Sequence, residues 1–168
     1  MFTDADMDRA DWVFLQNGAV TLFWDPAVLG TAKEDLRQLG YEISEVTCNN
    51  DKQSFQAQLS EVLHWEEQFG YGPWRGNLNA LNDGFREYPF TSRSALILES
   101  FHRLVATDSD FAHAVLDIIE RQARNSLLLG KALICLVQTD DNRYDCAPIG
   151  CRSATWNRRE WLHRDRGL

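Results

Sequence analysis

Two continuous apolar segments constrain the fold of this 168-residue chain more than any other feature. Residues 95–98 and 132–137 contain no polar side chain apart from one cysteine, which is typical of strands covered by helices on both faces. About thirty residues separate the two segments. Strand, helix and strand in this order predict parallel strands joined by a right-handed crossover. The helical pattern between them consists of Phe111, Val115, Ile118, Ile119 and Ala123.

The region before these strands predicts another strand and two helices. Residues 41–48 are typical of a strand, and residues 49–51 form a turn that can cap a helix beginning near Lys52. The apolar stripe of this helix extends to Phe69. A shorter helix is expected over residues 77–87, with Leu78, Leu81 and Phe85 on its apolar side and Asn79, Asn82, Asp83 and Arg86 on its polar side.

The N-terminal region predicts a β-hairpin. Residues 12–15 and 19–24 are short apolar runs joined by a segment that contains Asn17 and Gly18, and Asn-Gly is a strong hairpin signal. Asp25 followed by Pro26 predicts the start of a short helix that ends before Gly40.

The expected fold class is α/β, in two or three layers: a small parallel sheet packed by helices, with an added N-terminal β-hairpin and helix and a C-terminal tail. The length suits one domain with a substantial core. We expect residues 41–140 to form this domain, residues 1–40 to extend it, and residues 141–168 to pack on it.

Charge is distributed unevenly along the chain. The net charge is −8; residues 1–140 hold 21 acidic and 11 basic side chains, whereas residues 141–168 hold 4 acidic and 6 basic ones. The acidic body disfavours direct nucleic-acid binding and suits a basic partner. In the tail, arginines alternate with tryptophans over residues 156–166. This pattern predicts a short helix docked by Trp156, Trp161 and Leu162, with stacking on single-stranded nucleic acid as an alternative.

The sequence predicts a cytoplasmic protein that does not enter the membrane. The first residues are acidic, and no apolar run is long enough to cross a bilayer. In a reducing compartment we expect Cys48, Cys135, Cys146 and Cys151 to be free thiols.

No motif of a known enzyme class is recognisable, so we expect no catalytic activity, cofactor or metal. A phosphate-binding glycine loop, a nucleophile elbow and a zinc-protease helix are all missing. Cys146, Cys151 and His163 make only an incomplete zinc site, and the adjacent Glu66 and Glu67 are typical of a solvated helix face. The histidines His64, His102, His113 and His163 lie far apart in the sequence.

One segment carries a family resemblance. Residues 69–89 read Phe-Gly-Tyr-Gly-Pro-Trp-Arg-Gly-Asn-Leu-Asn-Ala-Leu-Asn-Asp-Gly-Phe-Arg-Glu-Tyr-Pro, which resembles the barstar family of ribonuclease inhibitors. The family has a glycine and aromatic loop followed by a short helix, with a strand and helix before them and a strand, helix and strand after them. Residues 41–140 match this order. The resemblance implies a three-stranded parallel sheet and an outward-facing loop and helix that block the active site of a ribonuclease.

The match within the motif is partial. Asn79 stands where the family's eponymous inhibitor has an aspartate at the interface, Asn82 replaces an aromatic contact residue, and the segment from Gly84 to Pro89 is shorter. These differences leave open whether the target is a barnase-like ribonuclease or a different toxin. The residues that match are Asn77, Leu78, Ala80, Leu81 and Asp83.

The resemblance implies that the chain is an inhibitor or immunity protein. Its carboxylate at Asp83 would act as a phosphate mimic toward the basic groups of a nuclease. The expected protein partner is a basic ribonuclease or another nuclease toxin. The expected partner-binding residues, in the loop from Tyr71 to Gly76 and on the helix, are Trp74, Arg75, Gly76, Asn79, Asn82, Asp83 and Arg86.

Structural roles are alternatives for several of these residues. Asp83 could pair with Arg86 or accept from backbone amides, Trp74 could pack in the core, and Arg75 could be an ordinary surface charge. An alternative function is a protein-protein interaction or regulatory module without a nuclease target. The sequence predicts no particular oligomeric state.

Overall fold

The computed structural model describes residues 8–88, 90–150 and 152–168, and its centre is a parallel sheet with the strand order β2-β3-β4-β1-β5. The strands are β1 (Val20–Phe23), β2 (Glu42–Thr47), β3 (Arg93–Glu99), β4 (Ala132–Gln138) and β5 (Thr155–Trp156). The helices are α1 (Ala10–Leu15), α2 (Pro26–Gln38), α3 (Lys52–Val62), α4 (Trp65–Phe69), α5 (Leu78–Glu87), α6 (Phe101–Thr107) and α7 (Ser109–Leu128).

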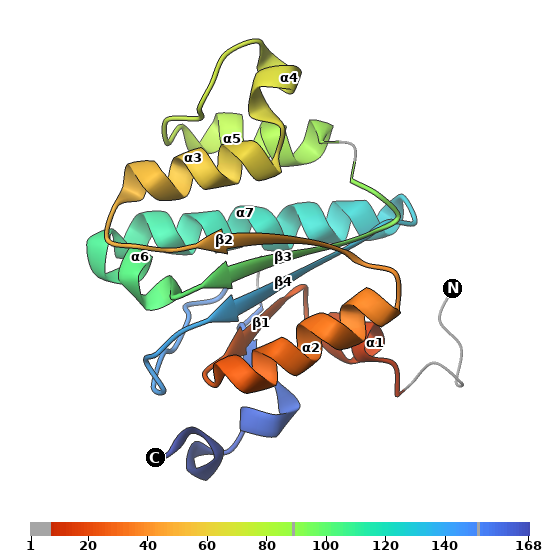
Figure 1. The fold of residues 1–168 in the computed structure, drawn as a ribbon, viewed down its shortest axis with the longest axis vertical. Coiled ribbons are helices and arrows are strands. Elements are labelled where there is room, and N and C mark those ends of the chain that lie inside the picture. The colour runs from red at the N-terminus through yellow and green to blue at the C-terminus, as the bar shows by residue number, and fades with distance from the viewer. Residues whose placement is uncertain (1–7, 89, 151) are drawn as a thin grey trace.

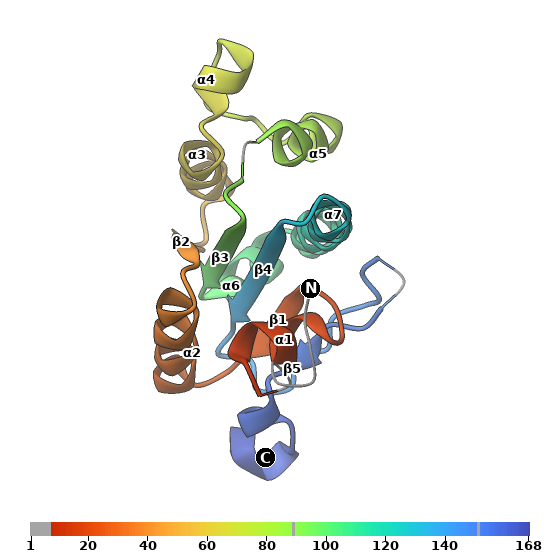
Figure 2. The ribbon, with the colours of Figure 1, turned by 90° about the vertical axis from the view of Figure 1, so that its right-hand side faces the viewer.

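Helices cover both faces of the sheet (Figure 1). On one face, Leu29 and Leu36 of α2 pack against Ile97 and Leu136. On the other face α7 lies along the sheet, and α3 and α5 continue this layer beyond the β2 edge (Figure 2). The expected α/β class is therefore confirmed.

The predicted strand-helix-strand unit is also confirmed. β3 and β4 are parallel neighbours with Ala95 opposite Ile134 and Ile97 opposite Leu136. The helix α7 between them buries Val115 and Ile119 completely. β2 extends this pair to three consecutive parallel strands, but the sheet continues through β1 and β5, so it has five strands and not the three that the family resemblance implies.

The prediction of an N-terminal β-hairpin is wrong. Residues 10–15 form the helix α1, and β1 lies between β4 and β5 with both neighbours parallel to it. All four residues of β1 are buried, so this strand needs neighbours on both edges, which a terminal hairpin would not provide. Instead of adding a separate hairpin, residues 1–40 contribute a strand to the same sheet as residues 41–140.

The helix predicted from Lys52 to Phe69 is interrupted at His64. This residue has φ 50° and ψ 46°, the left-handed conformation, and separates α3 from α4. Leu63 and Trp65 are 0% and 1% exposed. In a continuous helix these two side chains would point roughly 200° apart, so the interruption allows both to enter the core.

Residues 155–166 form β5 and two 3-10 turns in place of the single helix expected in the tail. Trp156 packs against the core, but Trp161 and Leu162 are 67% and 53% exposed and do not dock the tail. The buried Arg166 holds this segment. Its guanidinium donates to the carbonyls of Glu160 and Trp161 and lies 4.3 Å from the ring centroid of Trp156.

Among the described residues, no helix is both long enough and apolar enough to span a membrane.

A buried carboxylate fixes the start of β1. The Glu120 side chain, on α7, accepts hydrogen bonds from the backbone N–H groups of Ala19 at 2.7 Å and Val20 at 3.3 Å. We expect Glu120→Ala to lower the free energy of unfolding by about 2–4 kcal/mol, because two buried N–H groups lose their acceptor. Urea denaturation measures this change.

The matched control is Glu34→Ala on the exposed surface of α2, which should alter the free energy of unfolding by less than about 0.5 kcal/mol. Equal effects of the two substitutions would contradict the role of Glu120 at β1.

Candidate partner-binding site

The helix α5 and the loop before it lie at one end of the molecule, opposite the C-terminal segment (Figure 1). Asn77 begins the helix, because its side-chain oxygen accepts from the backbone N–H groups of Asn79 and Ala80 at 3.0 and 3.2 Å. Leu81 and Phe85 are buried on the inner side. The predicted apolar side of this helix is therefore confirmed.

Two tryptophans form the base on which α5 rests. Trp65 and Trp74 have ring centroids 6.2 Å apart, and Trp74 stacks on Phe111 of α7 with centroids 5.8 Å apart. A Cβ atom on Gly84 would lie 2.6 Å from Cζ3 of Trp65. The helix can approach the indole this closely only because residue 84 has no side chain.

Trp74 does not face solvent. It is 2% exposed, its backbone N–H donates to Ser60 Oγ at 2.8 Å, and its indole N–H donates to the carbonyl of Asn77 at 2.8 Å. The core-packing alternative therefore describes this side chain. Beside it, Arg75 is exposed, and Gly76 has φ 86° where the loop turns against Gln56.

The side chains expected on the polar side of α5 do not all face solvent. Asn82 accepts a hydrogen bond from Gln122 of α7 at 2.8 Å, so its oxygen faces the protein. Asn79 is exposed, and Asp83 pairs with Arg86 at 3.1 Å, with side-chain exposures of 46% and 57%. The intrahelical ion pair considered from the sequence is present, and both of its members stay accessible to a partner.

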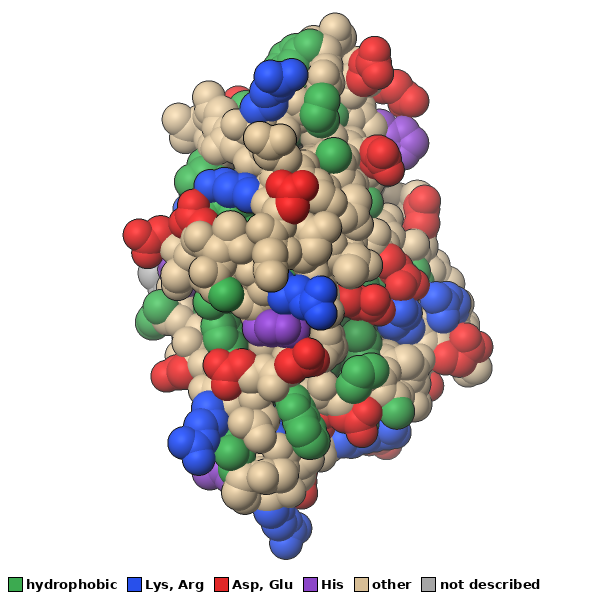
Figure 3. Space-filling model, turned by 60° about the vertical axis from the view of Figure 1, so that its left-hand side comes forward, with side chains coloured by type: hydrophobic (Ala, Val, Ile, Leu, Met, Phe, Trp, Pro, Cys, Tyr) green, Lys and Arg blue, Asp and Glu red, His purple; other side chains and the backbone are tan. Residues whose placement is uncertain are grey.

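Arg86 is held between two carboxylates. A hydrogen bond to Glu87 at 2.9 Å and the charge of Asp83 raise the pKa of the guanidinium above its usual value. Residues 61–88 hold five acidic side chains and two basic ones, a net charge of −3 without histidine. In Figure 3 acidic side chains flank a histidine near the upper end of the molecule.

A groove between α3 and α4 was missed by sequence reasoning. It has a volume of about 750 Å³ and lies between α3, α4 and the loop, where Glu61, His64, Glu66 and Glu67 contribute to its lining. The sequence indicated an ordinary solvated face for Glu66 and Glu67. The groove exists because the chain changes direction at His64, and nothing in the sequence around His64 signals that change.

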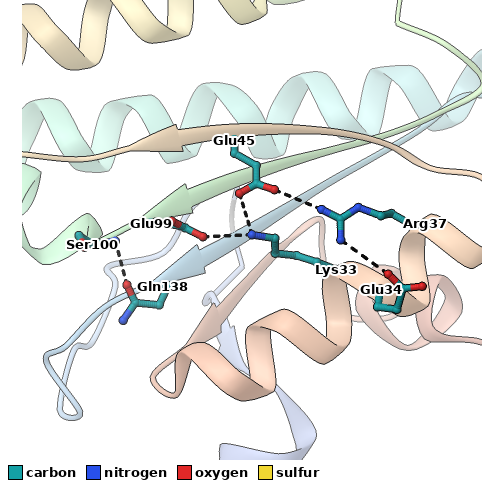
Figure 4. Close-up of polar contacts among 7 residues, drawn as sticks. All are labelled: Lys33, Glu34, Arg37, Glu45, Glu99, Ser100 and Gln138. Atoms are coloured by element: carbon teal, nitrogen blue, oxygen red, sulfur yellow. Dashed lines mark hydrogen bonds and ion pairs between the residues drawn. The ribbon is translucent and has the colours of Figure 1, made fainter.

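A second cluster of charges, on the α2 face of the sheet, is neutralised internally (Figure 4). Lys33 pairs with Glu45 at 2.7 Å and with Glu99 at 3.1 Å, and Arg37 pairs with Glu45 at 3.3 Å. Burial lowers the pKa of the Lys33 ammonium. The hydrogen bonds to the two glutamates and their charges together raise it by more than burial lowers it, so the pKa lies above its usual value. Every cation of this cluster therefore already has a carboxylate partner.

The cysteines and histidines form no composite site in the described part of the chain. Burial raises the pKa of the Cys48 thiol to about 12 and also raises that of Cys135, so both stay protonated. Among the described residues, which exclude Cys151, no three side chains are grouped as metal ligands. The histidines have different neighbours: His64 lies beside Glu67, His102 beside Asp140, His113 beside Cys146 and His163 beside Arg166.

Comparison with protein-family models found no match, and comparisons with curated proteins and with solved structures also found none. The resemblance to the barstar family thus stays a prediction that rests on residues 69–89 and on the order of elements over residues 41–140.

The contact between Gly84 and Trp65 can be tested with two substitutions of the same kind. We expect Gly84→Ala to lower the free energy of unfolding by about 1–3 kcal/mol, because the buried indole must move. In α2, a Cβ on Gly30 would have nothing within 4 Å, so Gly30→Ala should raise it by about 0.5–1 kcal/mol through helix propensity. Urea denaturation measures the free energy of unfolding of both variants. If Gly84→Ala were as stabilising as Gly30→Ala, the result would contradict the close contact between Gly84 and Trp65.

Proposed function

We propose that this protein is an inhibitor or immunity protein that binds a basic nuclease toxin through α5 and the loop before it, and that it acts by binding rather than by catalysis. The observation that supports this function best is the outward-facing group of Asn79, Asp83 and Arg86 on a helix fixed from below by Trp65 and Trp74. In this proposal the protein protects the cytoplasm in which it is made.

The anchoring of α5 favours binding. A side chain on a fixed helix loses less conformational entropy on association than one on a flexible loop. Asn77 caps this helix, Gly84 lies directly on Trp65, and Asn82 bonds to α7. The helix backbone that carries Asp83 is therefore already held in place before a partner arrives.

The charge of this end of the molecule fits a cleft that binds phosphate. Nuclease active sites hold phosphates with Arg, Lys and His groups, and a carboxylate at a fixed position can make the same charge-assisted hydrogen bonds. Asp83 is half-exposed and its present partner is the exposed Arg86. Because exposed ion pairs are weak, a cation of the partner can replace Arg86 at little cost.

Asp83→Ala should weaken association with the partner by about tenfold or more, because a carboxylate at the centre of the interface is lost. The experiment captures partners from the native cell, identifies them, and titrates the purified chain against RNA cleavage by the captured protein. The midpoint of thermal unfolding should stay nearly unchanged, because the ion pair with Arg86 is exposed.

Glu34→Gln, on the exposed surface of α2, is the matched control and should leave inhibition unchanged. Full inhibition by the Asp83→Ala variant would contradict the assignment of the site.

Asn79→Asp tests whether the target is a barnase-like ribonuclease. The substitution restores the acid of the family pattern at an exposed position in the first turn of α5, where the helix dipole stabilises a negative charge. Inhibition of a barnase-like ribonuclease should then improve several-fold, as measured by the inhibition constant, without loss of stability. An unchanged or weaker inhibition constant would indicate a different target.

The second candidate function is a protein-protein interaction module without a nuclease target. It is favoured by exposed apolar side chains elsewhere on the surface, on Leu128 and Leu129 at the C-terminal end of α7 and on Trp161 in the tail, which are 83%, 77% and 67% exposed. Capture of a partner that cleaves neither RNA nor DNA, and whose binding is insensitive to Asp83→Ala, would support this alternative.

A further inference from the structure

The end of α7 exposes three consecutive leucines. Leu127, Leu128 and Leu129 are 42%, 83% and 77% exposed, and they lie at the C-terminal end of this helix, near the point where β4 begins (Figure 1). We call residues 127–129 the leucine turn. Leucine side chains in water are unfavourable, and a group of them on a surface marks a contact with another molecule or with a membrane.

The leucine side chains point in different directions around the end of the helix. Leu127 and Leu128 are its last residues, and Leu129 follows them directly. Successive helical residues are about 100° apart around the axis, so three in a row cover roughly 200°. A flat protein surface covers only one side of such a helix end. The fluid hydrocarbon of a lipid bilayer surrounds inserted side chains and can bury all three together.

A pocket with a positive charge lies beside the leucine turn, and we call it the basic pocket. Leu127, Gly130 and Lys131 line it from the turn, and Arg93 lines it from the start of β3. Its volume is about 300 Å³, at the lower end of the range of ligand pockets. Because Leu127 belongs to both features, the leucine turn and the basic pocket form one continuous surface.

Two cations of the basic pocket have no carboxylate partner. The lining includes three basic side chains and one carboxylate, a net charge of +2 on a chain whose net charge is −8. The carboxylate is the buried Asp11, which accepts from Arg9 at 2.8 and 3.1 Å. Arg93 donates to the carbonyl of Leu39 at 2.5 Å, and in the described part of the chain neither Arg93 nor Lys131 makes an ion pair. These two side chains are therefore available to an anion.

We propose that the leucine turn and the basic pocket together dock this protein on a membrane surface that contains anionic phospholipids. The leucines enter the outer part of the hydrocarbon, and Arg93 and Lys131 bind the phosphate group of a lipid whose acyl chains lie beside the leucines. Apolar insertion and electrostatic attraction to anionic lipids both contribute to peripheral binding of this kind.

The two features favour a lipid over a soluble ligand. A phosphate in solution would pair with the cations but leave the leucines in water, whereas a phospholipid offers an anion and hydrocarbon in one molecule. The docking does not depend on the proposed nuclease target, because no residue of α5 is among those that line the basic pocket.

Co-sedimentation of the full chain with lipid vesicles tests this docking. Vesicles of phosphatidylcholine and phosphatidylglycerol in equal parts should bind the chain. The bound fraction should fall as the salt concentration is raised, because salt screens the attraction between exposed charges. Vesicles of phosphatidylcholine alone carry no net charge and should bind the chain several-fold more weakly.

The leucine variant, Leu128→Ser with Leu129→Ser, should reduce the partition coefficient on the mixed vesicles by about tenfold or more, because the inserted apolar area is lost. The matched control is Trp161→Ser with Leu162→Ser in the tail, where the side chains are 67% and 53% exposed. This control should bind the vesicles as the unmodified chain does. All four side chains are largely exposed, so both variants should fold normally.

The charge variant, Arg93→Gln with Lys131→Gln, should remove most of the preference for mixed vesicles over phosphatidylcholine, because the anionic headgroup loses its partners. Lys131→Gln alone keeps the hydrogen bond from Arg93 to Leu39 and should show part of the same change. Arg103→Gln with Arg152→Gln removes two exposed cations elsewhere and should keep the preference.

Several results would overturn the proposal. They are binding to neither kind of vesicle, equal binding to both kinds, and equal weakening by a variant and its matched control. Binding of glycerol phosphate without binding to vesicles would assign the basic pocket to a soluble ligand. Self-association or capture of a protein partner that the leucine variant abolishes, again without binding to vesicles, would assign the leucine turn to a protein contact.

Discussion

The contact between the indole of Trp65 and the backbone of Gly84 positions α5 at the outer end of this protein, the end that lies opposite the C-terminal segment. A Cβ on residue 84 would lie 2.6 Å from the ring, so α5 lies closer to the indole than a residue with a side chain at this position would allow. Trp65 is buried because the chain changes direction at His64, and the same change opens the groove between α3 and α4. The position of α5, the burial of the indole and the groove are thus consequences of one local arrangement.

This arrangement gives the outer end two surfaces of different character. The outer side of α5 carries Asn79, Asp83 and Arg86, in which one ion pair balances part of the charge. The groove carries carboxylates from α3 and α4 and no lysine or arginine among its described lining residues. In the proposed function, these carboxylates add to the negative potential that steers a basic partner toward this end of the molecule.

The sequence predicted secondary structure correctly where the residue types of a segment match the burial of that segment in the fold. The apolar runs around residues 95–98 and 132–137 are β3 and β4, because a strand buried on both faces requires apolar residues at every position. The prediction failed for residues 12–24, where the Asn-Gly dipeptide favoured a hairpin but β1 instead lies between β4 and β5. A turn signal extends over a few residues, whereas the choice of strand neighbours depends on contacts with segments more than a hundred residues away, such as the hydrogen bond that the Ala19 N–H donates to Glu120.

The amino-acid sequence by itself determined the α/β class, the short helix expected over residues 77–87 and the acidic character of the body, since each depends on neighbouring residues or on composition. Only the tertiary structure decided the five-stranded order of the sheet, the burial of Trp74, the inward orientation of Asn82 and the groove beside Trp65. Trp74 and Asn82 show the reason most clearly. The sequence left core packing of Trp74 as an alternative and placed Asn82 on a polar helix side, and it could not decide either orientation because Phe111 and Gln122 of α7, which contact them, are far away along the chain. Which side of a motif faces solvent depends on what packs against it, and such contacts are set by the folded chain as a whole.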